Sequence, residues 1–350
     1  MSLHKCKLGE LITQRREKNN DDSLPISGVS KDGLIPPKQQ EADTSLYNMF
    51  YRGDFIFNPA RMELNSIAYN DKYDKAICSS LYEVFYVHRT DLILPEFLAL
   101  IVKQDWFTRY CEFLGQGSAR EYCRFANISE IEIEFPDIDV QKKTVHCYNV
   151  IKRRIELKQQ INDNLEATVQ SLYQNMFIDN ADIASWKQGT VGDVLQLQRG
   201  HDLPRAEMLG GDYPVAGSTG TIGYHNQYTA KAPVIVMGRS GNIGNPRLYL
   251  CDCWTHNTSL YVKQLYQAEY LWAFYLLKNL NYDGFVGGSA VPTLNRNDVH
   301  AYSIPIPPLE LQKTFANRAI KLIIHKENNN SEIVKLQKMQ DVVLTTISSR

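Results

Sequence analysis

The chain has 350 residues, of which 43% are hydrophobic and 22% are charged, and its formal net charge is −1. This length accommodates two domains with a connecting structure, and the composition is typical of an ordinary globular protein. No apolar run approaches the roughly eighteen residues that span a bilayer, residues 1–10 lack a signal-peptide core, and the near-neutral charge argues against binding nucleic acid by charge alone.

The seven cysteines show no C-x-x-C pair, and Cys251-Asp252-Cys253 by itself is a poor metal site. We therefore expect free thiols in a reducing cytoplasm. No bound metal is expected.

The first globular stretch, residues 1–138, is predicted to contain short strands followed by a helix. Residues 51–58 read as a turn that feeds a strand, and 77–87 as a second strand. Residues 94–113 read as a helix, and 128–135 lead into a long helix.

Two long helices are predicted, one at residues 139–180 and one at 309–350. Both begin with a similar phrase, Pro136-Asp137-Ile138-Asp139-Val140-Gln141-Lys142 and Pro307-Pro308-Leu309-Glu310-Leu311-Gln312-Lys313, at an offset of 171 residues. The same offset relates Gly117-Ser118-Ala119 to Gly288-Ser289-Ala290. Proline followed by an acidic residue is a favourable start for a helix.

Downstream of each start, apolar residues recur at spacings of three and four, which indicates an amphipathic helix with a narrow seam. The seam positions are Tyr148, Ile151, Ile155, Leu165, Val169, Leu172 and Met176 in the first helix, and Ala319, Leu322, Leu336, Val343 and Ile347 in the second. Residues 328–330, three asparagines, form a polar weak spot. A helix of this length measures about 60 Å, so we interpret both as spacers that pair in antiparallel fashion.

The second globular stretch, residues 181–308, repeats the plan of the first. Its opening at 190–195 matches residues 7–12. Residues 213–225 predict a glycine-punctuated hairpin, 234–244 a strand entering a loop, 254–262 another strand, and 269–281 a helix. The duplication implies an approximate two-fold axis, a symmetry suited to reading two DNA half-sites.

Four phrases of this second half carry a family resemblance. They are Tyr-Pro-Val-x-Gly-Ser-x-Gly-x-Ile-Gly-Tyr at 213–224, Gly-Arg-x-Gly-x-Ile-Gly at 238–244, Trp-x-x-Asn-Thr at 254–258 and Pro-x-Pro-Pro-Leu-x-x-Gln at 305–312. Together they resemble the target-recognition domain of type I restriction-modification specificity subunits. The first half carries them weakly, with Asn65-Ser66-Ile67 in place of Gly-x-Ile-Gly.

The resemblance implies an α/β (α+β) fold with two target-recognition domains, at 1–138 and 181–308, that contain mixed or antiparallel sheets. Long antiparallel helices at 139–180 and 309–350 would form a coiled coil between them, with pseudo-two-fold symmetry. Each domain would read one half of a bipartite double-stranded DNA target through the major groove.

Polar loop residues are the candidates for contact with DNA. The guanidinium of Arg239 matches the two acceptors of guanine, and the side-chain amide of Asn242 or Asn257 matches the donor and acceptor of adenine. Phosphate and neighbouring contacts are expected from Ser218, Thr219, Gly220, Tyr224, His225, Ser240, Gly241 and Thr258, and the equivalent candidates in the first domain are Lys31, Asn58 and Arg61. The alternative is that the glycines only form tight turns and the asparagines only cap them.

No catalytic motif is complete. Residues 113–117 look like a methyltransferase cofactor loop but follow a predicted helix rather than a buried strand, and no phosphate-binding loop occurs. His201, His225 and His256 lack metal-ligand spacing. We expect a non-catalytic chain without a cofactor of its own.

The resemblance implies that the chemistry belongs to partners: two methyltransferase subunits with S-adenosylmethionine, and restriction or translocase subunits with ATP and Mg²⁺. No membrane partner is expected. Two alternatives remain open, a protein-binding scaffold without DNA specificity and the specificity module of a two-subunit enzyme that both cuts and methylates.

Overall fold

The computed structural model describes residues 3–21, 23–37, 43–115, 122–208, 210–282, 286–287 and 293–348. The chain divides into two compact units, unit 1 with Met1–Leu157 and Glu332–Arg350, and unit 2 with Lys158–Ser331. The matching Gly-Ser-Ala segments at 117–119 and 288–290 lie outside the described residues. In the part that is described, no helix combines the length and apolarity needed to cross a membrane.

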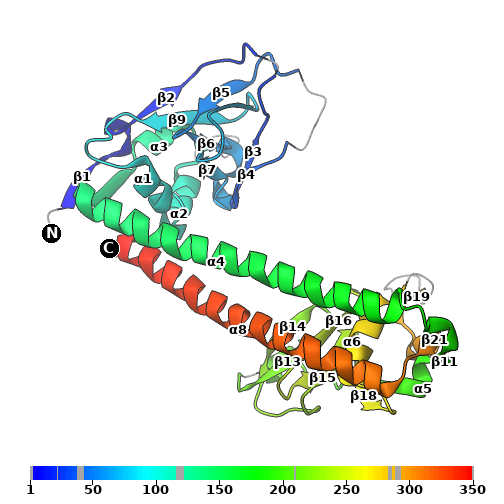
Figure 1. Ribbon diagram of the computed structural model, residues 1–350. Helices are drawn as coiled ribbons and strands as arrows, with labels where there is room; N and C mark the ends of the chain where they lie inside the picture. The colour runs from blue at the N-terminus through cyan, green and yellow to red at the C-terminus, as the bar shows by residue number, and fades with distance from the viewer. Residues whose placement is uncertain are drawn as a thin grey trace. The chain divides into compact units, whose positions relative to one another are not determined.

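Unit 1 contains a four-stranded antiparallel sheet in the order β2-β9-β6-β7 and three antiparallel strand pairs, β1-β10, β3-β4 and β5-β8 (Figure 1). The strands are β1 Leu3–Lys7, β2 Ile12–Arg15, β3 Gly28–Ser30, β4 Gly33–Ile35, β5 Asn48–Tyr51, β6 Phe55–Phe57, β7 Ile67–Tyr69, β8 Lys75–Cys78, β9 Glu83–Val87 and β10 Glu132–Pro136.

The helices of this unit are short before the long helix α4. They are the 3-10 helices η1 Leu8–Glu10 and η2 Pro59–Leu64, and the α-helices α1 Pro95–Ile101, α2 Asp105–Gly115 and α3 Phe125–Ser129. The single helix predicted at 94–113 is therefore wrong: it breaks between Ile101 and Asp105, where the backbone turns. Periodicity alone did not reveal this break, because both helices bury apolar residues.

The central strand β6 is buried on both faces. Phe55 and Phe57 pack into one cluster with residues of α1 and α2, whereas Ile56 packs into a second cluster with Phe50 and Val84. A short run of consecutive apolar residues is the pattern expected for such a strand.

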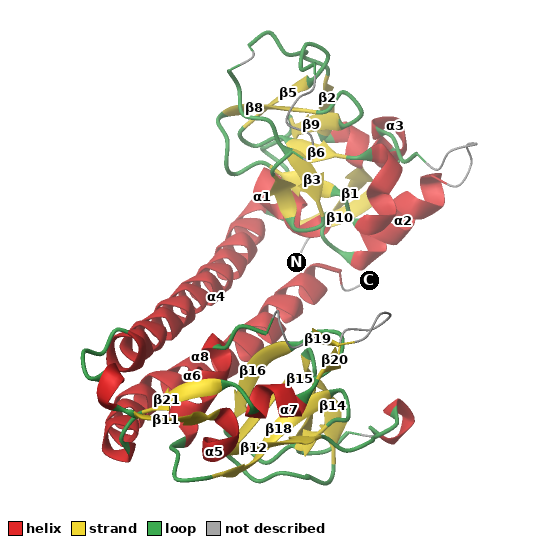
Figure 2. Cartoon of the chain, turned by 90° about the vertical axis from the view of Figure 1, so that its right-hand side faces the viewer, coloured by secondary structure: helices red, strands yellow, loops and turns green. Residues whose placement is uncertain are grey.

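Unit 2 repeats this arrangement with a sheet in the order β12-β18-β15-β16 (Figure 2). A second, mixed sheet has the order β14-β13-β17, where β13 pairs antiparallel with β14 and parallel with β17. The strands are β11 Lys187–Thr190, β12 Leu195–Arg199, β13 Tyr213–Gly217, β14 Gly220–His225, β15 Val234–Gly238, β16 Gly244–Tyr249, β17 Trp254–Thr255, β18 Ser259–Leu265, β19 Val286–Gly287, β20 Thr293–Leu294 and β21 Ser303–Ile306.

Short helices surround these strands. They are α5 Val191–Val194, α6 Tyr270–Asn279, α7 Arg296–His300 and the 3-10 helices η4 Ile183–Ser185 and η5 Arg205–Glu207. Strand β15 is again buried on both faces, with Ile235 and Met237 in one cluster and Val234 and Val236 in another. The equivalent order of the main sheets confirms the predicted duplication and the mixed and antiparallel α+β fold.

Two predicted strands are interrupted by turns. The segment 77–87 contains β8 and β9 with a turn at 79–82, and 254–262 contains β17 and β18 with a turn at 256–258. Each turn is only three or four residues long and lies between apolar strands, and residues 79–82 include Leu81 and Tyr82, so the sequence resembles one continuous strand.

The long helices are α4 Ile138–Tyr173, continued by a π-helical turn at Gln174–Ile178, and α8 Leu309–Ser348. In unit 1, Ile155 of α4 packs with Ile333 and Leu336 of α8, and Arg154 pairs with Glu332. In unit 2, residues of α4 and α8 share one core. Within each unit, later positions of α4 meet earlier positions of α8, which confirms the antiparallel pairing.

The predicted polar weak spot is a hydrogen-bonded cluster. Asn162 and Asn329 are only 6% and 5% exposed, and Asn329 Nδ2 donates to Asn162 Oδ1 at 3.0 Å. Lys158 Nζ also donates to Asn329 Oδ1, and Asn162 Nδ2 donates to Asn330 Oδ1. A buried polar pair of this kind disfavours other helix alignments that would leave it unpaired.

The repeated glutamine at each helix start anchors α4 or α8 to its own unit. Gln141 Oε1 accepts from Leu94 N at 2.9 Å, while Nε2 donates to the carbonyls of Leu92 and Pro136. Gln312 does the same with Glu269 N and the Pro307 carbonyl, each at 2.9 Å. The shared phrase at 136–142 and 307–313 thus has a structural cause.

Candidate nucleic-acid interface

Three turns of unit 2 meet at one end of its sheets. They are the β13–β14 turn at 218–219, the β15–β16 turn at 239–243 and the β17–β18 turn at 256–258. Asn242 Nδ2 donates to the Ser218 carbonyl at 3.3 Å, Ser218 N donates to Thr258 Oγ1 at 3.4 Å, and Arg239 N donates to the Thr258 carbonyl at 3.0 Å. We call these three turns the turn cluster.

The turn cluster brings together most of the residues predicted for unit 2. Thr219 and Gly241 are exposed and Gly220 is buried, while the others are half-buried: Ser218, Arg239, Ser240, Asn242, Asn257 and Thr258. Ser240 forms an isolated bridge with Thr293, which ties the second turn to β20. Polar groups from separate parts of the sequence therefore share one surface.

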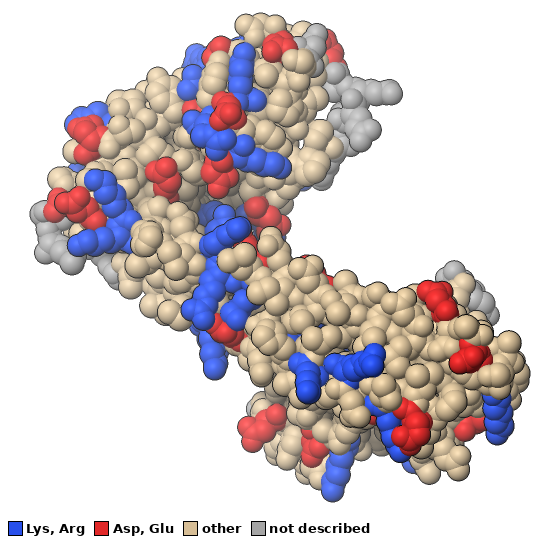
Figure 3. All heavy atoms as spheres, in the orientation of Figure 1, with Lys and Arg blue, Asp and Glu red and all other residues tan. Residues whose placement is uncertain are grey.

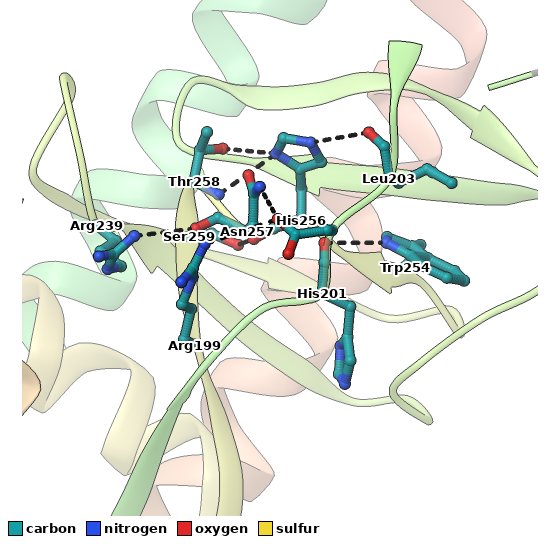
Figure 4. A network of polar contacts seen from close by, with 10 residues as sticks. Arg199, His201, Leu203, Arg239, Trp254, His256, Asn257, Thr258 and Ser259 are labelled. Carbon is teal, nitrogen blue, oxygen red and sulfur yellow. Dashed lines mark hydrogen bonds and ion pairs between the residues drawn. The ribbon is translucent and has the colours of Figure 1, made fainter. Parts of the chain in front are cut away.

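The third turn is held by side-chain hydrogen bonds (Figure 4). His256 Nδ1 lies 2.9 Å from Thr258 Oγ1, and Nε2 lies 3.3 Å from the Leu203 carbonyl. Asn257 Nδ2 donates to Asp202 Oδ1, and the same Oδ1 lies 3.7 Å from Arg199 Nη2. One of the two N–H donors of the Asn257 amide is thus engaged by Asp202.

Arg239 is less constrained. Its side chain makes one long hydrogen bond, from Nη1 to the Asn257 carbonyl at 3.4 Å, and it joins no ion pair among the residues described (Figure 4). A guanidinium has five donors in a planar fork. Most of its hydrogen-bonding capacity is therefore available to a ligand.

Tyr224 and His225 lie away from the turn cluster. They pair with Pro214 and Tyr213 at the opposite end of the β13–β14 hairpin. Tyr224 is 51% exposed, but the His225 ring stands edge-on to Trp254 at 5.1 Å, and its buried Nδ1 has no hydrogen-bond partner among the described residues. These two predicted residues therefore do not lie with the nine other predicted residues of unit 2, which are at the turn cluster.

In unit 1 the three predicted residues line one groove of about 1330 Å³. Lys31 lies in the β3–β4 turn, and Asn58 and Arg61 lie in the β6–β7 connection. Lys31 and Arg61 are exposed, whereas Asn58 Oδ1 accepts from Ala60 N at 3.1 Å and caps η2. The Asn58 side-chain oxygen is therefore engaged within the protein as a helix cap.

The two units place their candidates on equivalent connections. The β6–β7 connection of unit 1 corresponds to the β15–β16 turn of unit 2, because the main sheets have the same strand order. Asn65 has a positive φ of 51°, as Gly241 and Gly244 have in unit 2 at 77° and 71°. Asparagine tolerates this left-handed region, so Asn65 can take the backbone conformation that Gly241 has in unit 2.

Comparison with known proteins decides the family. Residues 15–167 and 184–337 each match the model of the type I restriction modification DNA specificity domain. The chain belongs to this family. The family predicted from the sequence phrases is thereby confirmed.

Individual relatives are more distant. The chain is 24% identical over 166 residues to the type I restriction enzyme HindI specificity subunit of Haemophilus influenzae, an alignment that covers 47% of the chain and 36% of that subunit. It is 22% identical over 296 residues to the MjaIX specificity subunit of Methanocaldococcus jannaschii, covering 73% and 68%. The S subunit structure from M. genitalium shares the fold, with a TM-score of 0.67 at 15% identity over 99% of the chain and 96% of that subunit.

The specificity domains carry little excess charge. On the face seen in Figure 3 most of the surface is uncharged, and basic and acidic side chains are interspersed. All seven cysteines are free, and in the described residues no group of His, Cys, Asp and Glu side chains is arranged to hold a metal ion.

Sequence reasoning missed several charged residues beside the candidates. Asp202 and Arg199 support the third turn, and Arg124 lies in the unit 1 groove, where its Nη1 is 3.7 Å from Glu83. Arg247 of β16 approaches the turn cluster from the neighbouring strand. None of these residues stands in a recognisable phrase, and only the fold brings them to the site.

Proposed function

We propose that the chain is the DNA-recognition subunit of a type I restriction-modification enzyme and that each specificity domain reads one half of a bipartite target. The observation that carries this proposal is the duplication: two matches to a DNA specificity domain, each with polar residues on the equivalent sheet connection. Two similar but non-identical readers suit two different half-sites.

In unit 2, Arg239 is the base reader best supported by the structure. Its free donors suit the O6 and N7 acceptors of guanine in the major groove. Asn242 and Asn257 suit adenine, while Ser218, Thr219, Ser240 and backbone amides suit phosphates. In unit 1, Lys31 and Arg61 are the exposed cations of the groove.

The helix pair is proposed to set the unread gap and to dock two methyltransferase subunits. Each long helix bears apolar side chains that remain solvent-exposed outside the buried seam. In unit 1 these are Val150 and Leu157 of α4 and Val334, Met339 and Val342 of α8; in unit 2 they are Ile161 and Ile324. These exposed apolar side chains support contact with a partner protein along the helices.

The chemistry is proposed to reside on the partners. Methyltransferase subunits would bind S-adenosylmethionine and methylate adenine, and restriction subunits would use ATP and Mg²⁺, with the chain itself non-catalytic and cytoplasmic. The sparse positive charge supports this division, because phosphate contacts that stabilise DNA binding must then come partly from other subunits.

A binding experiment tests the proposal. The complex of the chain with its co-purified methyltransferase subunits is mixed with a pool of random duplexes, and the bound fraction is sequenced. We expect enrichment of one split motif that disappears when the chain is omitted. A protein scaffold without DNA specificity would give the same unenriched pool in both cases and would refute the proposal.

A further inference from the structure

Arg247 projects from β16 toward the turn cluster. Along this strand Leu248 packs on the core that contains α6, whereas Tyr249 packs with Ala216 on the other face. Alternation along a strand places Arg247 on the same face as Tyr249. That face is the one covered by the β13–β14 hairpin, and Tyr249 shares a hydrogen bond with Thr221 of β14 at 3.3 Å.

The guanidinium of Arg247 lies across the backbone of Gly220 at the start of β14. A Cβ added to Gly220 would stand 2.7 Å from Arg247 Nη1 and 3.0 Å from Cζ. Glycine is required here for a positive φ of 119°, but the close approach gives a second reason. Any side chain at this position would displace the guanidinium.

The charge of Arg247 is not neutralised within the protein. Its side chain is exposed, and no ion pair involves it among the residues that the structure describes. By contrast, Arg199 is paired with Asp202 and Lys278 with Glu166 in the same unit. A solvent-exposed guanidinium without an ion-pair partner keeps its donors available to an anion.

We propose that Arg247 anchors a backbone phosphate of the DNA half-site read by unit 2, and that Gly220 positions it. This inference rests on the proposed function. Arg247 lies three residues beyond Gly244, about 10 Å along β16 from the turn that carries Arg239. Its guanidinium extends back to Gly220, beside the turn whose Ser218 and Thr219 are expected to contact phosphates, so it lies where the DNA backbone would run.

The experiment compares variants in the complex with the methyltransferase subunits, by fluorescence anisotropy with cognate and half-site-substituted duplexes over a range of salt. For R247A we expect about tenfold weaker binding to all duplexes, because one charged hydrogen-bonded contact is lost. The slope of log K against log salt should fall by about one, as for the loss of one phosphate contact. R247K keeps the charge and should keep the wild-type slope.

Two glycine variants isolate the positioning role. G220A should weaken binding as R247A does, and the double variant should be no weaker than either. G210A is the matched control: Gly210 also has a positive φ, 89°, but a Cβ there would meet no described atom within 4 Å. Backbone strain alone should therefore leave binding unchanged in G210A.

The outcomes separate the inference from the function on which it rests. If the wild-type complex bound cognate and half-site-substituted duplexes equally well, the proposed function itself would be refuted. With sequence preference intact in the wild type, an unchanged R247A affinity and salt slope, or an R247A variant that selects a different base in the half-site, would overturn the phosphate assignment. The phosphate assignment would also be overturned if the slope of log K against log salt fell as much in R247K as in R247A.

Discussion

The substitution Gln312→Leu tests whether the repeated glutamine anchors each long helix. Gln312 is 1% exposed, and its amide bridges Glu269 N and the Pro307 carbonyl. Leucine has a similar volume but no polar atom, so one buried donor and one buried acceptor lose their partner. At about 1–3 kcal/mol for each of these two unsatisfied groups, unit 2 should lose roughly 2–6 kcal/mol of stability.

Two measurements check this value. Denaturant unfolding gives the free energy, with the units followed separately because two domains need not unfold together. Hydrogen exchange reports directly on the Glu269 amide, whose protection should fall. Lys313→Ala is the control, since that side chain is 51% exposed and its ion pair with Glu310 is worth little. A loss below about 1 kcal/mol with unchanged exchange at Glu269 would refute the anchoring role.

Three further predictions concern other parts of the chain. Asn329→Leu should destabilise unit 2 by about 1–3 kcal/mol because the buried Asn162 Oδ1 loses its donor, whereas replacing both asparagines with leucine should restore the stability; denaturation in which the double variant is the least stable would contradict this. Burial, with a smaller effect of Arg296, lowers the pKa of His300, whose Nε2 accepts from Leu197 N at 2.8 Å. Unit 2 should be fully stabilised above about pH 6.5 and lose stability as pH falls through the lower folded pKa, and His300→Gln should remove this loss in thermal melts at stepped pH. Arg61→Ala should weaken cognate DNA binding by about tenfold in competition assays, and an unchanged affinity would exclude Arg61 from the interface.

The repeats made much of the fold predictable. The phrases at 136–142 and 307–313 and the seam positions were sufficient for two antiparallel helices, because three-four periodicity sustained over several turns is characteristic of an amphipathic helix. The breaks at 102–104, 79–82 and 256–258 were not predictable, since each lies between apolar segments that continue the pattern. Tertiary packing decides these turns.

The candidate site was predictable in part. The glycine-rich phrases located the turns at 218–219 and 239–243, because positive φ and close approach restrict those positions to few residue types. The interactions of Asn257 with Asp202 and of Arg247 with Gly220 join residues far apart in the sequence. Only the pairing of strands brings such residues together, so the local sequence holds no signal of them.

The most direct test of the account is a map of methylated adenines in cells that express the chain with its methyltransferase subunits, as wild type and as Arg239→Ala. We expect the wild type to modify one split motif with a fixed gap, and the variant to relax the sequence of one half only, with the gap and the other half unchanged. A contiguous motif in the wild type, or a change in both halves in the variant, would contradict the claim that each domain reads its own half-site.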